Sequence, residues 1–391
     1  MTLNALWSLF LVVGVAALAP IVSRLVPGRP PQVLFLIAGG VVIGPQGLGA
    51  AESVNVSLIA SLGLGFLFLL AGYELDPRLL RQRQGRLALR SWLVSAVLAV
   101  TVVGVLARTG FVHAYVPVAI ALTTTALGTL LPILRDNDML TGRLGGYVFA
   151  AGAVGEMLPI LAIALFLGAY KSVWEAAVIV GIAGLAYLLT WLPRRLADTR
   201  VAAIIADTRH STSQSTLRLT LVLLVGLLLI TERFGIDAAL GAFFAGMVLR
   251  RNAPADPTVF DEKLDTMGYG LFIPVFFVSS GMNLDVRSII DDPLRLLTFF
   301  ALLLAVRGVP ALLVYRKALV MRERLELMLL TATTLPLLVA LTEIGLQSGT
   351  MLPQNAAALV GAGVLSVAVF PVLAVRMHRR EPASEAREPA A

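Results

Sequence analysis

Apolar segments long enough to cross a membrane follow one another along almost the whole chain, separated by short polar stretches. A helix needs about 20 apolar residues to span the hydrocarbon core of a bilayer. Thirteen such segments are centred near residues 13, 40, 64, 98, 124, 156, 182, 224, 243, 273, 305, 335 and 366. The pattern therefore predicts an all-α polytopic membrane protein with about 13 transmembrane helices and no second folded domain.

The composition agrees with a membrane protein and removes several classes of function. Of the 391 residues, 58% are hydrophobic and 14% are charged, a balance outside that of soluble domains. The chain has no cysteine, and its three histidines (His113, His210 and His378) fall in predicted loops, so we expect no disulfide, no resident metal and no cofactor. Because no nucleophile–base pair or pair of catalytic acids is evident, we predict that the chain is not an enzyme.

The distribution of Lys and Arg predicts the orientation of the chain. The net charge is +7, but the basic residues lie beside the spans, which argues against a nucleic-acid partner. Alternate loops hold 24 basic residues on one side and 5 on the other. This bias predicts an external N-terminus and a cytoplasmic C-terminus in the plasma membrane. Residues 1–23 have no basic residue before their apolar run and are predicted to be the first span.

An internal repeat with a spacing of 209 residues links the two halves of the chain. The segment GLGFLFLLAGYELDPRLL (63–80) aligns with FIPVFFVSSGMNLDVRSI (272–289), and the same spacing carries Thr124–Thr125 onto Thr333–Thr334. The repeats comprise spans 1–6 and 8–13, so the second repeat enters the bilayer from the opposite side. We expect two inverted six-helix repeats, an architecture of secondary transporters with the substrate site near the bilayer midplane.

The repeat also predicts how the chain is divided. The expected parts are the first repeat with linking span 7 (1–193), a cytoplasmic linker (194–217), the second repeat (218–378) and a disordered tail (379–391).

Threonine runs at equivalent positions predict two broken helices that cross near the membrane centre. The first run is Thr123, Thr124 and Thr125, and the second is Thr333 and Thr334, followed by Pro336. Proline and threonine both disturb helical hydrogen bonding, and unwound backbone offers oxygen ligands that suit an alkali cation. The alternative is that each threonine merely bonds back to its own helix.

Glu156 is the candidate ion-binding acid, since it lies near the middle of an apolar span (147–167). A charge at that depth costs about 2.5–3.5 kcal/mol on insertion scales and is a functional-site hypothesis by default. Arg307 is the basic residue deep in a span. We expect its charge to offset the partial negative charge at the carbonyl ends of the broken helices, and to lower the proton affinity of the acid. A structural ion pair is the alternative for both residues. Other acids, Glu74, Asp76, Asp285 and Glu343, are expected at helix ends or interfaces.

A single carboxylate predicts a simple exchange. Glu156 can hold a proton or help to coordinate a monovalent cation, and competition between the two couples their fluxes. One proton for one cation, Na⁺ or K⁺, would make the exchange electrically silent.

The motifs resemble those of the monovalent cation:proton antiporters, in particular the branch that includes the glutathione-gated potassium efflux antiporters and related sodium/proton exchangers. They are LFLLAGYELD (67–76), TTTALGTLLPIL (123–134), PVFFVSSGMNLD (274–285) and Arg307, and the resemblance runs from about residue 5 to 377. It implies a core bundle of spans 4–6 and 11–13 that moves like an elevator. A second bundle of spans 1–3 and 8–10 would form a homodimer.

The resemblance also defines where this chain departs from the family. Members place an aspartate at the position of Glu156, often preceded by another Asp or by Asn. In this chain the preceding position is Gly155. Loss of the preceding side chain argues against electrogenic exchange of two protons.

Two other transport functions remain open at this level. A sodium-coupled organic solute symporter could use crossing broken helices, but it needs a larger polar cavity. A cation channel needs a continuous polar pore, and few polar side chains lie at depth.

Overall fold

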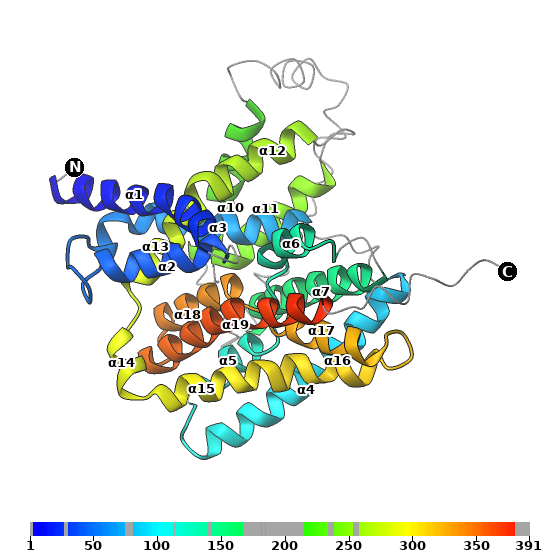
Figure 1. The fold of residues 1–391 in the computed structure, drawn as a ribbon. Helices are drawn as coiled ribbons and strands as arrows, with labels where there is room; N and C mark the ends of the chain where they lie inside the picture. Colours follow the sequence, from blue (N-terminus) through cyan, green and yellow to red (C-terminus); the bar gives the residue numbers. More distant parts are fainter. Residues whose placement is uncertain are drawn as a thin grey trace, which may run out of the picture. The chain divides into compact units, whose positions relative to one another are not determined.

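The computed structural model describes residues 3–26, 30–74, 81–112, 114–139, 143–166, 181, 184, 215–233, 238–252 and 258–379. All regular secondary structure within these ranges is helical (Figure 1). The predicted seventh span, the linker as far as residue 214 and the tail from residue 380 lie outside the described residues. The predicted all-α class is confirmed.

Seven α-helices are described in the first half of the chain. They are α1 (Leu3–Leu25), α2 (Gln32–Ile43), α3 (Ser57–Glu74), α4 (Arg83–Arg108), α5 (Tyr115–Ala121), α6 (Leu127–Asp136) and α7 (Arg143–Phe166). A 3₁₀ turn, η1 (Ser53–Val56), precedes α3.

The second half repeats this order with more interruptions. Its elements are α10 (Ser215–Arg233), α11 (Ala238–Arg251), α12 (Thr258–Met267), η3 (Gly268–Phe272), α13 (Ile273–Met282), α14 (Val286–Asp291), α15 (Pro293–Leu302), η4 (Leu303–Gly308), α16 (Val309–Val314), α17 (Met321–Thr331), α18 (Pro336–Gln347) and α19 (Pro353–Arg379). Both η3 and η4 are π-helical turns. By length and composition, seven of the described helical stretches could cross a membrane unaided.

The spacing of 209 residues holds for the helices as well as for the motifs. It carries α1 onto α10, α2 onto α11, and α4 onto the run from α15 to α16. The helices α6 and α18 begin at Leu127 and Pro336, which are 209 residues apart. The same shift carries α7 onto α19. The halves therefore share one succession of helices and breaks.

The chain divides into two units, and each draws helices from both repeats. Unit 1 comprises residues 1–26, 32–76 and 160–286, and unit 2 comprises residues 27–31, 77–159 and 287–391. Unit 1 thus contains predicted spans 1–3 and 8–10 and the end of span 6 from residue 160, and unit 2 contains spans 4 and 5, the first part of span 6, and spans 11–13. This is the grouping that the family resemblance implies.

Unit 1 packs by close approach of helix backbones at glycines. The helix α2 packs on α13, and α3 packs on α11, two pairs that the repeat exchanges. A Cβ atom at Gly40 would lie 2.1 Å from the carbonyl oxygen of Val278, and one at Gly246 would lie 2.0 Å from that of Leu69. Small residues are what allow membrane helices to approach so closely.

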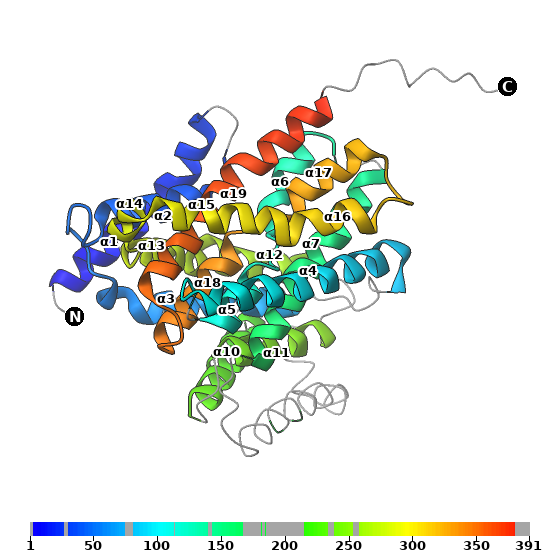
Figure 2. The ribbon, with the colours of Figure 1, turned by 90° about the horizontal axis from the view of Figure 1, so that it is seen from below.

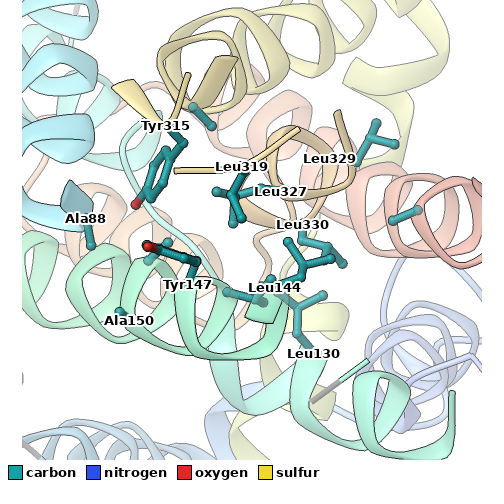
Figure 3. Packing of buried hydrophobic residues seen from close by; sticks show 14 of the residues in the cluster. Ala88, Leu130, Leu144, Tyr147, Ala150, Tyr315, Leu319, Leu327, Leu329 and Leu330 are labelled. Atoms are coloured by element: carbon teal, nitrogen blue, oxygen red, sulfur yellow. The ribbon is translucent and has the colours of Figure 1, made fainter. Parts of the chain in front are cut away.

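Unit 2 has an apolar cluster of buried side chains that joins α4, α6, α7, α17 and α19 (Figure 3). Figure 2 labels these five helices. Within the cluster, the rings of Tyr147 and Tyr315 meet edge to face with centroids 5.7 Å apart. Where α17 begins and α19 ends, the buried Glu326 accepts a hydrogen bond from Arg322 (3.2 Å) and contacts His378 Nδ1 (3.0 Å). These contacts hold together the helices that carry the site.

Candidate ion-binding site

Unit 2 contains two interrupted helices at repeat-equivalent positions. The first break separates α5, which ends at Ala121, from α6, which begins at Leu127. Its threonines end the helix by satisfying nearby carbonyls, since the hydroxyl of Thr123 donates to Ile120 and that of Thr124 to Ala121, both at 2.7 Å. The second break lies between Thr331 and Pro336, whose missing N–H suits the first turn of α18.

The two breaks contact each other directly, as the crossing of broken helices predicts. The hydroxyls of Thr124 and Thr334 are 2.7 Å apart, and the Ala126 N–H donates to the Thr333 carbonyl at 2.9 Å. Among the described contacts, both hydroxyl hydrogens have an acceptor only when Thr124 donates to the Ala121 carbonyl and Thr334 donates to Thr124, so we infer this direction. All of these threonine side chains are buried.

A serine that the sequence analysis missed stabilises the second break. Ser366 of α19 is fully buried and accepts a hydrogen bond from the Thr334 N–H at 3.1 Å. Its single hydroxyl hydrogen has two carbonyl oxygens within hydrogen-bond distance, those of Thr334 (2.8 Å) and Gly363 (2.7 Å). A single serine among small residues gives no signal in one sequence, because serine in a membrane helix usually bonds to its own backbone.

The first break also contacts α7 next to the candidate acid. The Thr125 N–H donates to the carbonyl of Gly155 at 2.9 Å, and Glu156 is the following residue. Gly155 is buried, whereas the Glu156 side chain is half-buried. The first break thus contacts the backbone of the residue that precedes Glu156, and the role of Glu156 in the site stays a prediction.

Arg307 joins the first break to α7. It lies in the π-helical turn η4 with 0% exposure. Its Nε donates to the Thr125 hydroxyl and its Nη2 to the Ala151 carbonyl, both at 2.9 Å. The Thr125 hydroxyl in turn donates to the Thr331 carbonyl at 2.6 Å. Arg307 therefore bonds to oxygens of α7 and of the first break, and through Thr125 it reaches the second.

The eight residues predicted for the site all lie in unit 2. They differ in where their polar groups are directed: Thr124, Thr125, Thr334 and Arg307 bond across helices, whereas the hydroxyls of Thr123 and Thr333 bond within their own helix. The Thr124 hydroxyl also donates to its own helix, at Ala121, so back-bonding occurs at Thr123, Thr124 and Thr333.

Backbone oxygens at the first break are free to act as ligands. In the part of the chain that the structure describes, no hydrogen bond ends on the carbonyl oxygens of Thr123, Thr124 or Thr125. Carbonyl oxygens are ligands that hard cations prefer. Within the same described residues, no group of three or more His, Cys, Asp or Glu side chains could hold a metal ion.

Comparison with known proteins identifies the family of the chain. Residues 13–377 match the family model described as sodium/hydrogen exchanger, transmembrane. YjbQ of Bacillus subtilis, which is provisionally named a Na⁺/H⁺ antiporter, is 25% identical over 97% of this chain and 64% of its own length. The glutathione-regulated potassium-efflux protein KefC of Salmonella arizonae is 27% identical over 98% of this chain and 63% of its own length. Cation/H⁺ antiporter 18 of Arabidopsis thaliana is 28% identical over 67% of this chain and 35% of its own length.

The chain thus spans between about one third and two thirds of the length of these relatives. Among solved structures, the sodium proton antiporter MjNhaP1 of Methanocaldococcus jannaschii has the same fold, with a TM-score of 0.61 and 16% identity over 95% of this chain and 99% of that one. These relatives are named as transporters and not as enzymes. The chain is a multi-pass membrane protein that belongs to the sodium/hydrogen exchanger family.

Proposed function

We propose that this chain exchanges a monovalent cation, Na⁺ or K⁺, for a proton, with Glu156 as the group that binds both. One observation carries the proposal: the carboxylate follows directly after the residue whose carbonyl accepts the Thr125 N–H at the crossing of two broken helices. The titratable acid and the oxygens proposed to bind the cation thus belong to two backbone segments that are joined by a hydrogen bond. The names of the relatives support this class of transport.

Competition at Glu156 is the proposed coupling mechanism. When Glu156 is ionised, its carboxylate and the oxygens of the first break bind the cation. When Glu156 is protonated, the cation loses its charged ligand. The empty carrier does not cross, so each half-cycle moves one proton or one cation and the exchange is one for one.

The proposed motion is an elevator-like movement of unit 2, which contains all residues of the site. The bonds of Arg307, Thr124 and Ser366 within that unit support movement as one piece. We further propose a homodimer in the plasma membrane, with the N-terminus outside and the C-terminus in the cytoplasm.

Proton flux in liposomes tests the proposal. The native chain, reconstituted in liposomes with an acidic lumen, should release protons from the lumen when Na⁺ or K⁺ is added outside. Each alkali cation is tried separately. The Glu156→Gln variant should reduce this flux to that of empty liposomes. Glu343→Gln is the matched control, because Glu343 is also a half-buried acid in a helix of unit 2 and bonds to Gln347. Its flux should stay near the native rate.

Three results would contradict the proposal. Cation-driven proton flux that persists in Glu156→Gln would remove the carboxylate from the mechanism. Flux that requires an organic anion would favour a symporter, and cation conduction without proton movement would favour a channel.

A further inference from the structure

Helix α7 contains a proline four residues after Gly155. In a regular α-helix the Gly155 carbonyl would accept the N–H of residue 159, but Pro159 has no N–H to give. Pro159 is buried and belongs to unit 2, as do Gly155 and both breaks. Buried carbonyls are almost always hydrogen-bonded in native proteins. The Gly155 carbonyl is therefore left for a donor from another element.

That donor comes from the first break. The Thr125 N–H donates to the Gly155 carbonyl at 2.9 Å. Glycine allows this close approach, because a Cβ atom at position 155 would lie 2.5 Å from the Thr125 hydroxyl oxygen, and real Cβ atoms essentially never come below 3.0 Å. The bond holds Thr125 within the stretch whose backbone carbonyls, those of residues 123–125, are the proposed cation ligands.

The second repeat makes the equivalent contact with a different group. The shift of 209 residues carries Thr125 onto Thr334, and it carries Pro159 onto Ala368, which has its N–H. The Thr334 N–H donates to the hydroxyl of Ser366 at 3.1 Å. Each break thus gives the N–H of its last threonine to the helix that follows. The acceptor is a carbonyl without its helical donor where the proline is present, and a serine hydroxyl where it is absent.

We propose that Pro159 is a positioning residue of the transport site, which releases the Gly155 carbonyl from α7 so that this carbonyl anchors the first break through Thr125. The anchor sets the direction in which the carbonyl oxygens of residues 123–125 point. An N–H at position 159 would compete with Thr125 for the same carbonyl, and the break would lose its fixed orientation. This inference rests on the proposed function, because it takes those oxygens as ligands of the transported cation.

The Pro159→Ala variant restores the N–H and separates cation affinity from turnover. Because the binding oxygens lose their orientation, we expect the KM for Na⁺ or K⁺ to rise by about tenfold, while the rate at saturating cation stays within about threefold of the native rate. A proline that serves only the shape of α7 predicts a different result. Alanine is the better helix former, so the melting temperature would rise and KM would stay unchanged.

A second variant isolates the single N–H. Lactic acid at position 159, introduced by nonsense suppression, has the methyl side chain of alanine and an ester oxygen in place of the N–H. It lacks the pyrrolidine ring, as Pro159→Ala does, and differs from that variant in the missing donor alone. The Gly155 carbonyl then stays available to Thr125, so KM should lie near the native value.

Pro371→Ala is the matched control, because Pro371 is a buried proline inside α19 of the same unit. Four residues before it is Val367. Among the hydrogen bonds between the described residues, none from another element ends on the Val367 carbonyl. This variant restores an N–H without a competing donor, so its KM should also lie near the native value.

The outcomes separate this inference from the proposed function. Absence of cation-driven proton flux in the native chain would defeat the proposed function. If the native chain is active, an unchanged KM in Pro159→Ala, or an equal rise with lactic acid or in Pro371→Ala, would overturn the role of Pro159. If Pro159→Ala yields no folded protein, the lactic acid variant decides: folded protein with a native KM supports the inference, and any other result overturns it.

Discussion

At the residue scale, the hydroxyl pair of Thr124 and Thr334 has a direction, and this direction makes the two threonines unequal. Thr334 donates to Thr124, which donates to the Ala121 carbonyl. Removing the Thr334 hydroxyl leaves Thr124 with a satisfied hydrogen. Removing the Thr124 hydroxyl leaves the buried Thr334 hydroxyl without its acceptor, whereas the Ala121 carbonyl keeps the Thr124 N–H as a donor.

We therefore predict that Thr124→Val destabilises the protein more than Thr334→Val. A buried polar group left without a partner costs about 1–3 kcal/mol, whereas a lost hydrogen bond alone costs about 0.5–1.5 kcal/mol. The double variant should cost less than the sum of the two, because valine on both sides leaves fewer unmet groups. Thermal unfolding in detergent measures all three.

Thr101→Val is the control for this series, because Thr101 bonds within α4 and is exposed. This variant should change the midpoint temperature of thermal unfolding little. Equal losses for the two single variants, or strict additivity in the double variant, would contradict the chain of donors inferred for the crossing.

At the element scale, the start of α15 is fixed by a capping residue that also orients an arginine. Asp292 accepts hydrogen bonds from the Arg295 N–H (3.1 Å) and from Arg295 Nε (3.0 Å). Arg295 Nη1 also donates to the side-chain oxygen of Asn355 in α19 (2.6 Å). The guanidinium stacks over the ring of Phe111, 4.8 Å from its centroid. The cap thus helps to hold three segments of unit 2 at one end.

This cap predicts a pH-dependent contribution to stability. The hydrogen bonds from Arg295 lower the pKa of Asp292 below its ordinary value. The unfolded chain then binds more protons than the folded one, so the contribution is present above the ordinary aspartate pKa of about 3.9. It is lost as the pH falls through the lowered pKa of the folded state.

Asp292→Asn keeps a capping oxygen and removes the charge. We expect its melting temperature to lie below that of the native protein at pH 7, and the difference to shrink as the pH falls below about 4. Melting curves at pH 7, 5, 4 and 3 measure the difference. A difference in melting temperature that stays constant down to pH 3 would show that the charge of Asp292 does not contribute to stability.

Some elements could be predicted from the sequence because their residues act locally. The breaks follow from threonine runs and Pro336, whose effect on a helix needs no distant partner. Three features could not be predicted: the π-helical turn η4 that carries Arg307, the link through Ser366, and the close approach of Arg307 and Thr125 to Gly155. Each depends on atoms of a second helix, and a single sequence does not state which helices meet.

At the scale of the whole molecule, the repeat was visible because both halves make the same succession of helices and breaks. Gly72 and Gly281, which match at the spacing of 209 residues, both lie where a Cβ would meet a backbone carbonyl of another helix, that of Phe243 and of Ile37. The packing of unit 1 therefore demands glycine in each copy. The division of the chain at residues 193 and 217 stays a prediction, since the linker lies almost wholly outside the described residues.

The last prediction concerns the charge moved in one cycle. In the described part of the crossing, Glu156 is the acid beside the breaks, and Gly155 supplies no second carboxylate. One proton exchanged for one monovalent cation moves no net charge. Net proton flux should therefore stop when a tenfold cation gradient opposes one pH unit, at 0 mV and at −100 mV alike. One uncompensated charge would add about 2.3 kcal/mol at 100 mV and move that balance point by roughly fiftyfold in cation gradient. Liposomes with a clamped membrane potential measure the balance point directly, and a shift of that size would replace the one-for-one cycle with electrogenic exchange.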